Sequence, residues 1–162
     1  MGGMTWFRRH ERPPPPVEQD VTDDPVALQR TLDGLVGFIN QNAGKLPGES
    51  VVAARRVTDT VREVIDTSEG GTLDVYATVS VKGIVNDYLP TSLRTYLALD
   101  PQVLDVRRPT GRTPKESLLE QLTSLWAAAA DVLAAAQAQD ADALVAQGSF
   151  LRTKFTGSDL DL

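Results

Sequence analysis

Residues 113–136 read TPKESLLEQLTSLWAAAADVLAAA, and this stretch decides the class of fold. Thr113 is a good helix N-cap, Pro114 suits the first helical position, and Glu116 follows at the capping-box spacing. Alanines at 127–130 and 134–136 combine high helix propensity with small side chains. Apolar residues recur at helical steps of three and four, at Leu118, Leu122, Leu125, Ala129, Leu133 and Ala136. The stretch therefore predicts a long helix with one buried face.

Helix signals of the same kind occur on both sides of this stretch. Downstream, Asp140 is expected to cap a last helix with apolar residues at Ala143, Leu144, Ala146, Phe150 and Leu151. Near the other end, Asp24 and Pro25 form a favoured helix start, and an apolar stripe follows at Leu28, Leu32, Leu35 and Ile39. Gly34 and Gly37 interrupt that helix, and close approach of a neighbouring helix would offset their cost.

A further helix is predicted to open near Ser50 and to run to about Thr67. Its apolar face consists of Ala54, Val57, Val61, Val64 and Ile65. On the opposite side, Arg55 and Arg62 each have an aspartate four residues later, which predicts ion pairs within the helix.

Residues 73–88 fit two structures. Apolar residues alternate strictly with others from Leu73 to Lys82, which is typical of a strand. No other segment has a strand pattern, however, and a lone strand would leave backbone groups unpaired along both edges. We therefore favour a helix with a buried stripe of Tyr76, Val79, Gly83, Ile84 and Tyr88, and a strand paired between two protomers remains the alternative. Pro90 is expected to end or kink this helix, before a short helix at residues 93–99.

These elements predict an all-α fold, an antiparallel bundle of four to five helices with a disordered N-terminal arm. The arm covers residues 1–24 and includes four consecutive prolines at 13–16, which cannot join a helix. The bundle domain covers residues 25–155, and residues 156–162 are expected to fray.

Composition excludes several classes of function. The chain has no cysteine and its only histidine is His10 in the arm, so no thiolate site, catalytic triad or histidine metal site can form. No phosphate-binding glycine motif occurs, and we expect no cofactor and no bound metal. Residues 1–12 have a net charge of +2 and the remainder −8, and such an acidic body disfavours nucleic acid. The absence of cysteine and of an apolar span favours a cytoplasmic protein.

Three groups of residues are candidate binding sites. The first is the aromatic and basic cluster of Trp6, Phe7, Arg8 and Arg9, which suits a protein groove or peripheral contact with a membrane. The second is a predicted helix–proline–helix corner, where Tyr88 and Tyr96 would pack together and direct their hydroxyl groups at a partner. The third is a basic loop with Arg107, Arg108 and Arg112, which together with Lys115 suits a phosphate or an acidic peptide.

The string Tyr88-Leu89-Pro90-x-x-Leu93-x-x-Tyr96-Leu97-x-Leu99 resembles one found in small helical bacterial proteins. These include the family named for 5-bromo-4-chloroindolyl phosphate hydrolysis, which is associated with toxic-anion resistance. The string covers about a tenth of the chain. The resemblance implies a helical fold and a bacterial setting, and it implies no catalytic residue in this chain, which has no phosphatase motif.

The sequence thus predicts a non-catalytic helical module that binds a protein partner or a membrane surface. A hydrolase that uses carboxylates and a metal is one alternative, since 22 acidic residues offer many carboxylate pairs. A self-assembling structural protein, a homo-oligomer formed through glycine and alanine faces, is the other.

Overall fold

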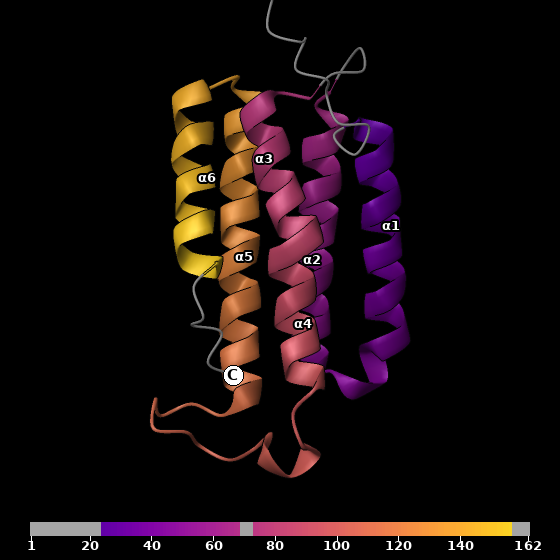
Figure 1. Cartoon of the computed structure of the whole chain (residues 1–162), viewed down its shortest axis with the longest axis vertical. Coiled ribbons are helices and arrows are strands. Elements are labelled where there is room, and N and C mark those ends of the chain that lie inside the picture. Colours follow the sequence, from indigo (N-terminus) through magenta and orange to yellow (C-terminus); the bar gives the residue numbers. More distant parts are fainter. Residues whose placement is uncertain (1–23, 69–72, 157–162) are drawn as a thin grey trace, which may run out of the picture.

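The computed structural model describes residues 24–68 and 73–156, and their regular structure is entirely helical (Figure 1). The α-helices are α1 (Pro25–Asn42), α2 (Gly48–Asp66), α3 (Val75–Gly83), α4 (Leu89–Leu97), α5 (Pro114–Gln137) and α6 (Ala141–Phe155). Short 3₁₀ turns follow α1 at Ala43–Lys45 and α4 at Pro101–Val103. The predicted all-helical class is therefore confirmed for these residues, while the predicted arm and tail lie almost wholly outside them.

Three helices begin where the sequence predicts, because their N-cap side chains accept hydrogen bonds from backbone N–H groups. Asp24 accepts from Val26 at 3.1 Å, and Thr113 accepts from Glu116 at 3.2 Å. Asp140 accepts from Ala143 at 3.0 Å. Such caps satisfy donors that a helix start otherwise leaves free. Helix α2, predicted to open near Ser50, begins two residues earlier at Gly48, and Ser50 is buried inside the helix.

The predicted apolar stripes of α1 and α2 are confirmed, since every residue of both is buried. The apolar stripe predicted for α5 matches the buried residues as far as Ala129, and beyond it the buried positions differ from the predicted ones. Val132 and Ala135 are buried there, whereas Leu133 and Ala136 are only partly buried. A step of three after Ala129 keeps the stripe facing the core, because a helix turns by 3.6 residues.

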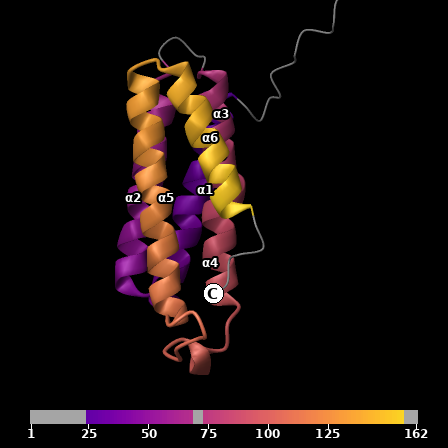
Figure 2. The same ribbon diagram turned by 90° about the vertical axis from the view of Figure 1, so that its left-hand side faces the viewer.

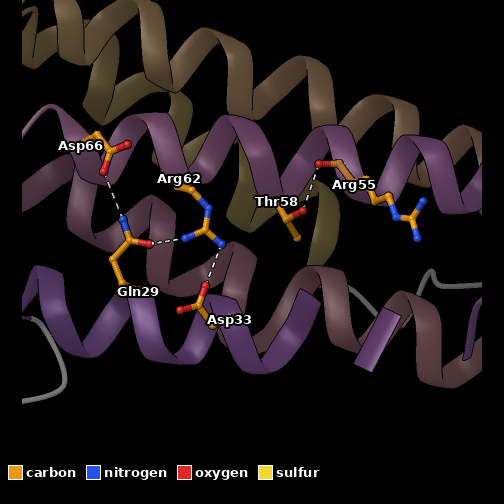
Figure 3. Close-up of polar contacts among 6 residues, drawn as sticks. All are labelled: Gln29, Asp33, Arg55, Thr58, Arg62 and Asp66. Carbon is orange, nitrogen blue, oxygen red and sulfur yellow. Dashed lines mark hydrogen bonds and ion pairs between the residues drawn. The ribbon is translucent and has the colours of Figure 1, made fainter. Parts of the chain in front are cut away.

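A polar seam joins α1 to α2 (Figure 3). The Arg62 guanidinium donates to Gln29 Oε1 at 2.8 Å and to Asp33 Oδ1 at 2.7 Å, and Gln29 Nε2 donates to Asp66 Oδ1 at 3.2 Å. Gln29 near the start of α1 thus meets Asp66 at the end of α2, so these two helices are antiparallel. The arginine pairs predicted within α2 are replaced by bonds to α1, because the planar fork of a guanidinium can reach two acceptors there. Arg55 likewise donates to Asn40 Oδ1 at 3.0 Å.

Two other pairs of neighbouring helices, α2 with α5 and α3 with α6, are parallel. The Arg56 guanidinium lies 5.3 Å from the Trp126 ring centroid, and Asp66 shares a cavity with Gln137, so α2 and α5 are parallel. Figures 1 and 2 show α6 beside α3, with both helices running away from the same end of the molecule.

Residues 75–97 form one helical rod without a corner. A π-helical turn at Ile84–Tyr88 joins α3 to α4, and the Leu89 N–H donates to the Ile84 carbonyl five residues earlier. Tyr88 and Leu89 keep right-handed helical dihedral angles up to Pro90. The predicted helix–proline–helix corner is therefore wrong. The wider turn accommodates the proline, which occupies the first turn of α4 and has no N–H to place.

Candidate functional site

Helix α3 is apolar on both of its faces. Ala77, Val81 and other residues face the core, while Val75 is 65%, Tyr76 46% and Val79 57% exposed. Tyr76 and Val79 were predicted to be buried, and this part of the predicted stripe is wrong. The strand-like alternation is explained by this arrangement, because a helix that is apolar all round places such residues at odd and even positions alike. Apolar helix faces are normally covered, so the exposed face of α3 is a candidate binding surface.

A groove of about 230 Å³ lies between α3 and α6. Its walls come from Tyr76, Val79, Ser80 and Tyr88 on one side and from Leu144, Val145, Gly148, Ser149, Leu151 and Arg152 on the other. Val145 is 44% exposed and extends the apolar face of α3 onto α6. Gly148 faces α3 across the groove, where a Cβ atom would make an ordinary contact with Ser80 Oγ at 3.7 Å.

The floor of the groove is polar at one point. Ser80 is 2% exposed, and its Oγ has no hydrogen-bond partner among the residues that the structure describes. An unsatisfied buried hydroxyl costs about 1–3 kcal/mol, so a ligand that bonds to it would recover part of that free energy. The groove therefore combines apolar side chains with a few polar ones, among them Ser80, Ser149 and Arg152, which is the usual composition of a binding site.

Charges of opposite sign stand at the two ends of the groove. Asp74 precedes α3, and Asp140 and Asp142 lie at the start of α6, where all three are exposed. Arg152 lines the other end. Because α3 and α6 are parallel, the three aspartates gather at one end, which favours a ligand with positive charge there.

The two candidate tyrosines do not pack together. The Tyr88 ring lies 5.7 Å from the Phe155 ring and lines the groove, whereas Tyr96 is 2% exposed on α4. The predicted clamp between them is therefore wrong, because no corner brings α4 back onto the π-helical turn. Burial raises the pKa of both hydroxyl groups, and the Asp87 carboxylate raises that of Tyr88 further.

The raised pKa of Tyr88 predicts a loss of stability in alkaline solution. Below pH 10.0, both folded and unfolded chains keep the phenol proton, so the stability is fully present. Above that pH the unfolded chain releases the proton first, and the free energy of unfolding falls as pH rises toward the folded-state pKa. Urea unfolding at about pH 9 and about pH 11 measures this fall. Tyr88→Phe should show a shallower fall than the parent, and identical slopes would contradict the prediction.

The basic loop is largely neutralised by acidic neighbours. Arg107 lies 3.6 Å from Glu116, and Lys115 lies 3.0 Å from Asp105. Arg112 pairs with Glu120, while Arg108 is partly buried. These pairs leave little net positive charge for a phosphate. Binding by this loop stays a prediction, as does binding by Trp6, Phe7, Arg8 and Arg9, which lie outside the described residues.

Carboxylates also line a larger cavity of about 510 Å³ beside α2 and α5. Glu63 and Asp66 are there, but Asp66 already accepts a bond from Gln29 in the polar seam. Within residues 24–68 and 73–156, no three acidic or histidine side chains gather as a metal site would require. In the same ranges, no helix is both long and apolar enough to cross a bilayer.

Comparison with known proteins adds no relative: no protein-family model, curated protein or solved structure matches the chain. The resemblance through the Tyr88–Leu99 string therefore stays a prediction, and the site rests on the geometry of the groove alone.

Proposed function

We propose that the chain is a non-catalytic helical interaction module of the bacterial cytoplasm that binds a protein partner through the groove between α3 and α6. The exposed apolar face of α3 carries this proposal. The side chains of Val75, Tyr76 and Val79 are exposed to solvent. Covering them with a partner would be favourable by roughly 25 cal/mol for every Å² of apolar surface buried.

The shape of the groove favours a peptide segment as the bound element. Two parallel helices form its walls, and such grooves bind a short segment by inserting a few apolar side chains. Val79 and Val145 are placed to contact such side chains, while the charged ends set the direction of the segment.

Affinity capture from host lysate tests the proposal with a matched pair of variants. Val79→Lys places a charge on the groove wall, and Val52→Lys makes the same change on α2, where valine is 49% exposed. Both positions are exposed and helical, so we expect changes in stability within about 0.5 kcal/mol. The expected result is a protein retained by the parent and by Val52→Lys but lost from Val79→Lys. Equal retention by all three would contradict a role for the groove.

A further inference from the structure

We propose that the groove between α3 and α6 is the docking site for the chain's own segment Trp6–Arg9, bound in cis. This inference deepens the proposed function, on which it rests, by naming a ligand for the same site. The segment would occupy the groove until a partner with similar anchors displaces it.

The size and chemistry of the groove fit one indole ring. A volume of about 230 Å³ suits a single large aromatic side chain rather than the surface of a folded protein. The indole N–H is a donor that cannot accept, and Ser80 Oγ on the groove floor has no hydrogen-bond partner in residues 24–68 and 73–156. Trp6 would therefore cover Val79 and Val145 with its ring and donate a hydrogen bond to Ser80.

The charges agree with this placement. Arg8 and Arg9 directly follow Trp6 and Phe7, and the acidic end of the groove carries Asp74, Asp140 and Asp142. With the indole beside Val79, the two guanidinium groups would reach carboxylates one or two helical turns away. Rim charges of this kind steer association and set orientation, and salt weakens them.

The segment is tethered close enough to reach the groove. The Arg94 guanidinium on α4 lies 5.5 Å from the Phe38 ring near the end of α1, so α1 starts at the same end of the molecule as α3 (Figure 1). Fourteen residues lie between Arg9 and Asp24, and the fifteen Cα–Cα steps from one to the other span at most about 50 Å. The rod from Val75 to Leu97 is about 35 Å long, so every part of the groove is within reach.

Tethering also makes a short ligand sufficient. A four-residue cluster buries too little surface to hold a separate molecule firmly, but a tether long enough to span the distance supplies an effective concentration of the order of millimolar. A second copy of the chain is the less favoured occupant, because a stable dimer buries about 800 Å² on each partner and the groove offers only a few exposed apolar side chains.

Fluorescence of Trp6 in the full-length chain tests the proposal. Trp126→Phe leaves Trp6 as the only tryptophan, and circular dichroism checks that this variant keeps its helices. We expect blue-shifted emission and weak quenching by acrylamide. In this background, Val79→Lys should shift the emission to the red and raise the quenching constant several-fold, while Val52→Lys should change neither. Ser80→Ala should raise quenching less than Val79→Lys does, since it removes one hydrogen bond and keeps the apolar walls.

Three outcomes would overturn docking in cis. Trp6 that is quenched as freely in the parent as in Val79→Lys is not bound in the groove. Protection that grows with protein concentration assigns the groove to a second copy. Protection that appears only with anionic vesicles assigns the segment to a membrane. Capture from lysate tests the proposed function separately. Freely quenched Trp6 together with Val79-dependent capture would remove this inference and leave the function. Protected Trp6 without Val79-dependent capture would leave docking in cis and remove the function.

Discussion

Replacing Leu151 by alanine is expected to lower the free energy of unfolding by about 2–5 kcal/mol and to open the groove. Leu151 is 0% exposed and lies where α6 packs against the core beneath the groove. Its truncation removes the transfer free energy of the lost methyl groups and leaves a cavity whose walls collapse only in part. Because α6 ends only four residues later, at Phe155, the loosened segment includes the α6 wall of the groove.

A matched leucine on α5 separates the two effects. Leu125 is also 0% exposed, but it does not line the groove, so Leu125→Ala should cost a similar 2–5 kcal/mol. Urea unfolding measures both losses. In the Trp126→Phe background, under conditions where both variants are folded, only Leu151→Ala should increase quenching of Trp6. Equal quenching in the two variants would mean that the groove does not depend on how α6 packs.

The parts of the fold that could be predicted from the sequence are those set by local chemistry. Asp24, Thr113 and Asp140 cap helices because the interactions of a cap lie within three residues. The stripe of α1 is equally local, since residues spaced by three and four must share a face. These features required no knowledge of which helix packs against which.

Features that depend on packing partners were predicted wrongly. The break expected at Pro90 is the main example: the helix favoured for residues 73–88 is confirmed, but it continues through Pro90 to Leu97. The π-helical turn is a local adjustment that no residue pattern in this sequence announces. Likewise, Arg62 could be expected to pair with Asp66 four residues later, but the position of α1 supplies Asp33 and Gln29 as better acceptors.

In the candidate site, too, the features set by local sequence could be predicted and those set by packing between helices could not. Tyr88 was identified correctly as a residue of interest, yet it pairs with Phe155, more than sixty residues away in the sequence. Val145 and Gly148 were missed altogether, because an exposed valine and a helical glycine become significant only when α6 lies beside α3. The usable signal was the alternation at residues 73–82, which places apolar side chains on both faces of α3.

Gly83→Ala is expected to destabilise the protein by up to about 2 kcal/mol, although alanine is the better helix former. A Cβ atom at Gly83 would lie 2.6 Å from Cε2 and 2.9 Å from Cζ of Tyr88. The ring cannot swing away freely, because Tyr88 is buried against Phe155. Relief must move the ring or the π-helical turn, and overpacking of this kind exceeds the roughly 1 kcal/mol that alanine gains in propensity.

Gly34→Ala is the matched control, and we expect it to stabilise the protein. A Cβ atom at Gly34 would meet nothing within 4 Å, so no neighbouring helix approaches closely there, contrary to the expectation from sequence. The free energy of unfolding should rise by about 0.5–1 kcal/mol, as helix propensity acts without a steric cost. Urea unfolding of both variants measures the difference. If both glycines gain stability as alanine, then the Tyr88 ring has room to move, and the wall that it forms in the groove is not rigid.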